Sequence, residues 1–119
     1  MCVQAIRGAT SVEADEPSAI YARTTELVQQ MLSSNDISVT DLVSVFFTCT
    51  PDLTSAFPAT AARAMGLEDV PLMCAVEMGV NNAPTGIIRV MMHIQSTQKR
   101  EDLTHVYLHA ATGLRSNIV

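Results

Sequence analysis

The chain has 119 residues, of which 48% are hydrophobic and only 16% are charged, and its formal net charge is −5. This length fits one domain, residues 1–119. Its core is small, so we expect a site with many charged groups to include residues of a second subunit. The negative charge, with no basic cluster beyond Lys99-Arg100, excludes the electrostatic footprint of a nucleic-acid-binding protein. No apolar run approaches the ~20 residues that a membrane span requires, so we expect no membrane partner either.

The N-terminal part of the chain predicts a strand followed by a helix. Residues 2 to 7 are typical of a strand, which Gly8 interrupts. An acidic segment then precedes Pro17, and this combination indicates a helix start with Asp15 as the N-terminal cap. We expect one stripe of the helix to face the core. It consists of Ile20, Thr24, Leu27, Val28 and Met31.

The remainder predicts four more strands and one more helix. Residues 42–50 are rich in β-branched and aromatic side chains, which indicates a strand buried on both faces. Pro58 suits the first turn of a second helix, which Gly66 would end. Three further strands are predicted in the runs 70–78, 87–94 and 105–108. The order β-α-β-α-β-β-β indicates an α/β (α+β) fold, a mixed sheet with two main helices on one face.

Two opposite charges stand inside the apolar runs of this second half. Arg89 interrupts the run 87–94, and Glu77 is the only acidic residue between Val70 and Arg100. Burying a guanidinium group without an anionic partner is costly, so the pair suggests a site. Two simpler interpretations stay open: Arg89 on the solvated face of its strand, or a purely structural salt bridge with Glu77.

The basic residues favour an anionic small molecule as the ligand. Six of the seven are arginine, whose planar guanidinium group holds carboxylates bidentately. No glycine-rich phosphate loop is present, which argues against a nucleotide cofactor. His105 and His109 stand four residues apart, but on a predicted strand, where this spacing does not favour a zinc site. We therefore expect neither a cofactor nor a metal.

The cysteines predict a reducing compartment. Cys2, Cys49 and Cys74 are odd in number and widely spaced, which supports neither a disulfide framework nor a zinc knuckle. The N-terminus lacks the basic and apolar regions of a secretory signal. We expect reduced thiols in a cytoplasmic protein.

Five segments, in order between residue 3 and about residue 115, share the pattern of one family. They are Ile6-Arg7-Gly8-Ala9-Thr10, Thr50-Pro51-Asp52-Leu53 with Ala56-Phe57-Pro58-Ala59, Cys74-Ala75-Val76-Glu77-Met78, Ile88-Arg89-Val90-Met91-Met92 and His105-Val106-Tyr107-Leu108. Together these segments resemble the small monofunctional chorismate mutases of the AroH type, the trimeric Bacillus type. Each motif is weak alone, but five in register make a chance similarity improbable.

The resemblance implies an activity, an assembly and a fold. The activity is the Claisen rearrangement of chorismate to prephenate, in the shikimate pathway to phenylalanine and tyrosine, without a cofactor. The assembly is a homotrimer shaped as a pseudo-α/β-barrel, with active sites between adjacent subunits. Each subunit would have a ferredoxin-like or chorismate-mutase-II-like fold. These implications agree with the oligomer and the anionic ligand that the composition favours.

The resemblance also assigns roles to residues of this sequence. Arg89 would stabilise the negative charge that develops on the ether oxygen of chorismate. Arg7 and Tyr107 would hold a carboxylate, while Glu77 and the thiol or backbone of Cys74 would take the ring hydroxyl. The other substrate-binding residues that the resemblance implies are Phe57, Ala59, Arg63, Leu72, Met73, Leu114 and Arg115.

Two departures from the family pattern affect the expected site. Thr60 stands where the family often has lysine, so a positive charge at the mouth of the site is missing. The sequence also stops at Val119, before the C-terminal tail that closes the site in longer relatives. The alternatives are a trimeric imine or enamine hydrolase of the Rid type and a non-catalytic trimer that binds a metabolite.

Overall fold

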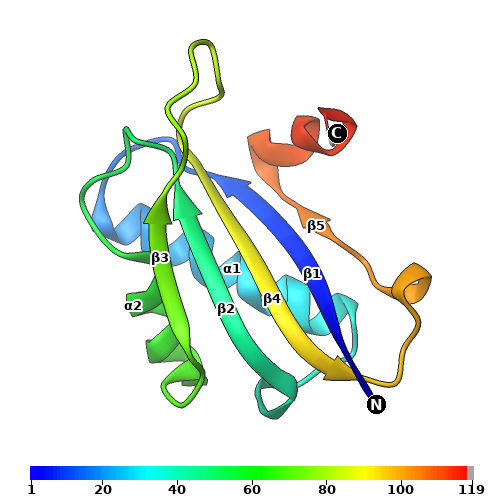
Figure 1. Cartoon of the computed structure of the whole chain (residues 1–119). Helices are drawn as coiled ribbons and strands as arrows, with labels where there is room; N and C mark the ends of the chain where they lie inside the picture. The colour runs from blue at the N-terminus through cyan, green and yellow to red at the C-terminus, as the bar shows by residue number, and fades with distance from the viewer. Residues whose placement is uncertain (118–119) are drawn as a thin grey trace.

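The computed structural model consists of one sheet with two main helices packed against it (Figure 1). The structure describes the backbone of residues 1–117 and the side chains of residues 1–114. The strands are β1 (Cys2–Ser11), β2 (Leu42–Cys49), β3 (Leu72–Val76), β4 (Ile87–Ser96) and β5 (Val106–Tyr107). The helices are α1 (Pro17–Ser34) and α2 (Pro58–Ala62), with short helical segments η1 (Val39–Asp41), η2 (Arg63–Leu67), η3 (Arg100–Asp102) and η4 (His109–Asn117). The predicted order of strands and helices is confirmed.

The sheet is mixed, and its strand order is β3-β2-β4-β1-β5. The long strand β4 lies in the middle and runs antiparallel to both neighbours, β1 and β2. The outer pairs, β2 with β3 and β1 with β5, are parallel. This arrangement places the N-terminal strand β1 beside β4 and the C-terminal strand β5 at the edge next to β1.

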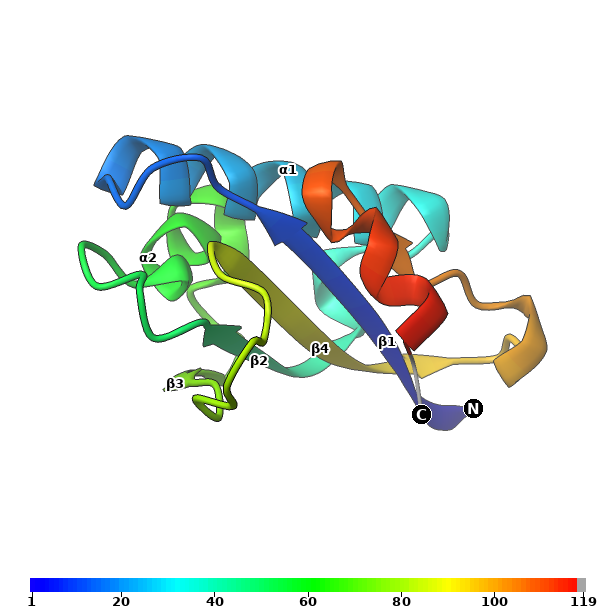
Figure 2. The ribbon, with the colours of Figure 1, turned by 90° about the horizontal axis from the view of Figure 1, so that it is seen from above.

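Both main helices lie on the same side of the sheet, as Figure 2 shows. The predicted stripe of α1 is confirmed, because all five of its residues are buried. Val90, Met92 and Ile94 of β4 face this layer and are buried as well, whereas Arg89 and His93 alternate with them and point to the opposite face. We call that opposite side, which the helices do not cover, the open face.

Strand β2 is not buried on both faces as predicted. Val45 and Phe47 are buried beneath the helices, but Phe46 and Val43 are 40% and 39% exposed on the other side. The prediction was wrong for the single chain because α1 and α2 cover only one face of the sheet. Strand β2 therefore presents apolar side chains on a face that neither main helix covers.

Asp15 does not cap α1. Glu16 occupies the cap position and makes no side-chain capping bond. The Asp15 carboxylate instead accepts hydrogen bonds from Thr54 N at 3.0 Å, Thr54 Oγ1 at 2.9 Å and Ser55 N at 3.0 Å. Desolvation opposes ionisation of this group, but the hydrogen bonds from Ser55 and Thr54 outweigh it and hold the pKa of Asp15 below its usual value. The contact fixes the loop that leads into α2.

Asn35 joins the end of α1 to the segment before β5. Its side chain is buried, and Nδ2 donates to Met31 O at 2.8 Å and to Thr104 O at 2.9 Å. Its Oδ1 accepts a hydrogen bond from Thr104 N at 2.7 Å. These bonds satisfy backbone groups on both elements and so set the position at which the chain enters β5.

Gly8 does not interrupt β1, which continues to Ser11. It permits close approach of α1, because a Cβ at this position would lie 2.5 Å from Met31 Sδ and 3.1 Å from Leu27 Cδ1. The residue that suggested a break is therefore required by packing between helix and sheet.

We predict that Gly8→Ala lowers the free energy of unfolding by about 1–3 kcal/mol, because the added methyl group overpacks the interface with α1. Urea unfolding followed by circular dichroism measures the change. Gly79→Ala is the matched control, since its new Cβ would meet only Pro51 Cγ, at 3.8 Å. Equal stability of Gly8→Ala and the wild type would contradict this account of the packing.

Candidate active site

The register of the sheet fixes a row of side chains across the open face. Arg89 on β4 is paired with Thr48 on β2 and with Ala9 on β1. Ala9 is paired in turn with Tyr107 on β5. Residues paired in this way point to the same face, so strands from distant parts of the sequence bring Thr48, Arg89 and Tyr107 together.

Arg89 forms an ion pair with Glu77, in which Nε lies 2.8 Å from Oε1. Glu77 follows β3, and its backbone N–H donates to Cys49 O at 2.9 Å, which extends the pairing of β2 with β3 by one step. Because β2 lies between β3 and β4, the ion pair crosses β2 at the level of Thr48. The Arg89 side chain is 45% exposed and that of Glu77 only 20%. The salt bridge considered as one simpler interpretation is thus present, and Arg89 also reaches solvent, as the other interpretation had it.

The ion pair lines a cavity of about 420 Å³ on the open face. Five of the predicted site residues meet there, namely Arg7, Glu77, Arg89, Tyr107 and Leu114. Gly8, Ala9, Phe46, Thr48, Val90 and Met91 complete the lining. Two guanidinium groups against one carboxylate leave an excess of positive charge, which suits an anionic ligand of small size.

The segment η4 holds Leu114 against this cavity. Its start is anchored to α1 by His109 Nε2, 2.7 Å from Glu26 Oε1, and to β1 by Ala110 N, which donates to Ser11 Oγ at 3.0 Å. Ala111 is buried in a cluster with Ala9 and Ile87, against which Leu114 packs. The wall that Leu114 provides is thus tied to both α1 and β1.

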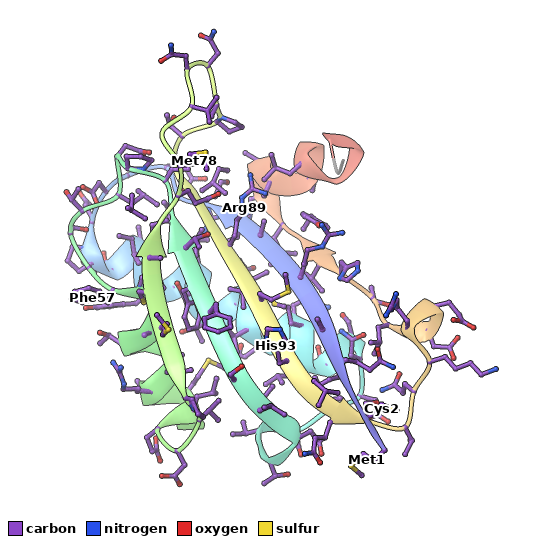
Figure 3. All side chains as sticks on the ribbon, in the orientation of Figure 1. Met1, Cys2, Phe57, Met78, Arg89 and His93 are labelled. Carbon is purple, nitrogen blue, oxygen red and sulfur yellow. The ribbon has the colours of Figure 1, made fainter. Side chains whose placement is uncertain are left out.

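The other predicted site residues lie elsewhere on the chain. Phe57 and Cys74 line a second cavity, of about 410 Å³. Figure 3 shows Phe57 outside the β3 edge of the sheet, away from Arg89, and its side chain is 69% exposed. Ala59 is buried in α2, and Arg63 is exposed at the start of η2. Leu72, Met73 and Cys74 belong to β3.

The thiol of Cys74 is not brought to the cavity of Arg89. Cys74 is paired with the buried Phe47 and packs against the core on the helix side of the sheet, whereas Glu77 faces the open side. Residues 74 and 77 are an odd number apart, so a strand turns them to opposite faces. The strand period could have given this separation from the sequence. The side chain of Arg115 lies outside the described residues.

Cys49 shares the second cavity with Cys74. Burial raises the pKa of the Cys49 thiol to about 11, with smaller contributions from the negative charges of Cys74 and Glu77 when ionised. Cys49 is therefore a protonated thiol at neutral pH. Its surroundings disfavour a role as a nucleophile.

His105 supports Arg7 from behind the cavity. The Arg7 backbone N–H donates to His105 Nδ1 at 2.9 Å, and this bond requires an unprotonated Nδ1. Burial, and then the charge of Arg7, lower the pKa of His105 below its usual value. The folded chain therefore binds fewer protons at this group than the unfolded chain does.

We predict that His105→Asn flattens the dependence of stability on pH in mildly acidic solution. The stabilisation is complete above the unfolded-state pKa of about 6.5, and it is lost as the pH falls through the lower pKa of the folded state. Asparagine keeps an acceptor for Arg7 N–H but cannot be protonated. Urea unfolding at about pH 7 and about pH 5 should show a smaller loss for the variant than for the wild type. Equal losses would contradict the role of His105.

The sheet with helices on one face and an arginine-lined cavity on the other defines an α+β protein whose cavity suits a small anion. Among the described side chains, no three His, Cys, Asp or Glu residues are grouped closely enough to hold a metal ion. No helix within residues 1–117 has the length and apolar character of a membrane span.

Comparison with known proteins identifies the family. The family model described as chorismate mutase type I matches residues 3–118. Over 117 residues the chain is 44% identical to the chorismate mutase AroH of Thermus thermophilus, an alignment that covers 98% of this chain and 96% of the relative. Over 119 residues it is 36% identical to the chorismate mutase AroH of Bacillus subtilis (strain 168), with 99% and 94% covered.

A solved structure, that of a chorismate mutase from Clostridium thermocellum, has the same fold. It superimposes with a TM-score of 0.92 at 42% sequence identity, covering 93% of this chain and 99% of the other. The chain therefore belongs to the type I chorismate mutases, the isomerases that convert chorismate to prephenate.

Proposed function

We propose that this chain converts chorismate to prephenate in the cavity lined by Arg89 and Glu77. The observation that carries the proposal is the ion pair of these two residues, set beside Arg7 and Tyr107 on an open sheet face. Chorismate has two carboxylates, an ether oxygen and a ring hydroxyl. The cavity offers cations and hydrogen-bonding groups for each of them.

The reaction needs no nucleophile and no obligatory proton transfer. It is an intramolecular rearrangement, so the protein contributes by holding a compact conformation of the substrate and by stabilising the charge that develops as bonds reorganise. Arg7 and Tyr107 would bind a carboxylate and hold the enolpyruvyl arm over the ring. The Leu114 wall would restrict the same arm from the side of η4.

Arg89 would stabilise the transition state electrostatically. The ether bond breaks with negative charge growing on its oxygen, and a cation fixed in advance at that point lowers the barrier. Glu77 Oε1 fixes Arg89 through Nε, while Glu77 Oε2 is buried and has no hydrogen-bond partner. Oε2 would accept from the ring hydroxyl and face the positive charge that develops on the ring.

The rest of the predicted site would come from a second subunit. Phe57, Arg63 and Cys74 lie apart from the cavity of Arg89, so one chain does not enclose a ligand with both groups. We propose a homotrimer with the shape of a pseudo-α/β-barrel. In it, Phe57, Arg63 and Cys74 of one chain close the Arg89 cavity of the next. The apolar side chains on the uncovered side of β2 and β3 support it, since Phe46 is 40% and Met73 62% exposed.

The proposal extends to the setting of the reaction. We place it in the cytoplasm, in the biosynthesis of phenylalanine and tyrosine. All three cysteines are free thiols, which agrees with a reducing compartment.

We predict that Arg89→Lys lowers the rate constant kcat by roughly 10²–10³-fold, because one ammonium cannot reproduce both the bond to Glu77 and the contact with the ether oxygen. The loss of chorismate absorbance gives the rate, and identification of prephenate confirms the product. Arg23→Lys is the matched control, since the largely buried Arg23 pairs with the exposed Glu13 at 3.0 Å, away from the cavity. Near-normal turnover by Arg89→Lys would rule out the proposed role of Arg89.

A further inference from the structure

Thr48 is a residue of the cavity that the sequence pattern did not single out. It is paired with Arg89 across β2 and β4, and it lies beneath the ion pair that connects Arg89 with Glu77. Its Oγ1 is buried and has no hydrogen-bond partner. Burying a hydroxyl group without a hydrogen-bond partner costs free energy. A ligand in the cavity that bonds to Thr48 Oγ1 would remove this cost.

Glu77 Oε2 is in the same condition, and the two atoms are complementary. The carboxylate oxygen can only accept, whereas the threonine hydroxyl can donate. By its hydrogen-bonding capacity, a ligand hydroxyl group placed between the two atoms would donate to Glu77 Oε2 and accept from Thr48 Oγ1. Such a ligand would satisfy both buried atoms at once.

The position of Thr48 separates it from other buried threonines. The hydroxyl groups of Thr10 and Thr24 are also without a partner, but both residues are fully buried in the layer between sheet and helices, and neither lines a described cavity. Thr48 lines the cavity of Arg89, where a ligand has access. Thr24 therefore provides a matched control with the same chemistry and no access to the site.

We propose that Thr48 is a further substrate-binding residue, whose hydroxyl group donates a hydrogen bond to the ring hydroxyl of chorismate while that hydroxyl donates to Glu77 Oε2. The inference rests on the proposed function and adds a specificity element to it. Glu77 alone leaves the lone pairs of the ring hydroxyl unsatisfied once water is excluded. Thr48 supplies the missing donor and so favours a substrate that carries a hydroxyl at this point.

Thr48→Val tests the proposal, because valine has nearly the same shape and lacks only the hydroxyl group. We expect kcat/KM for chorismate to fall about 5- to 10-fold, the effect of one lost hydrogen bond. Thr48→Ser should retain activity within about twofold because it keeps the donor. Thr24→Val should match the wild type. If Thr48→Val does not fold, Thr48→Ala takes its place, with the unfolding midpoint measured for each variant.

A second measurement distinguishes binding from mere support of the ion pair. Two competitive inhibitors are compared, a bicyclic dicarboxylate with a ring hydroxyl and the same compound without it. Thr48→Val should weaken binding of the hydroxylated compound about 5- to 10-fold and leave that of the deoxy compound unchanged. Equal losses for both compounds, or no loss for either, would overturn the assignment. Turnover of chorismate by the wild type tests the proposed function separately, and its absence would refute that function instead.

Discussion

The ion pair between Arg89 and Glu77 is the contact on which the site depends. It crosses β2 above Thr48, so it exists only while β3, β2 and β4 keep their register. A slip of one residue would turn Arg89 toward the helices, because side chains alternate between the two faces of a sheet. The buried positions Val90, Met92 and Ile94 prevent that slip, since they face the helix layer. The buried residues on the helix side of β4 thus fix the position of Arg89 on the open face.

The same geometry leaves the single chain with an open face. Strand β2 carries apolar side chains in both directions, and among the described residues α1 and α2 cover only one of its two sides. Arg7, Tyr107 and Leu114 gather around Arg89, while Phe57 and Arg63 remain apart from that cavity. A neighbouring subunit that covered the open face would bury apolar surface and complete the site in one step. The proposed trimer links stability of the assembly to activity in this way.

Local patterns in the sequence predicted much of this structure. The order of elements and the stripe of α1 followed from spacing, and the isolated charges of Arg89 and Glu77 marked two residues that the fold brings together. Asp15 was assigned to the wrong partner because its true partners, Thr54 and Ser55, lie far along the chain. The clamp made by Asn35 and the role of Gly8 depend on the same kind of distant contact.

At the site, too, the sequence reasoning was incomplete for physical reasons. Within one chain the strand period turns Cys74 and Glu77 to opposite faces, so their predicted joint contact with the ring hydroxyl would need Cys74 of a second chain. Thr48 was not singled out because its segment was predicted to be buried on both faces. Strand β2 would be buried on both faces, as predicted, only if another chain covered Phe46.

Mixed oligomers give the most direct test of a site shared between subunits. Arg89→Ala and Arg63→Ala chains are purified separately, then unfolded and refolded together, and the mixture is assayed for conversion of chorismate. Each variant alone should be nearly inactive, and the mixture should recover about a quarter of the wild-type rate, because random assembly joins an intact Arg89 to an intact Arg63 at that fraction of interfaces. A mixture no more active than its components would contradict a site formed by two chains.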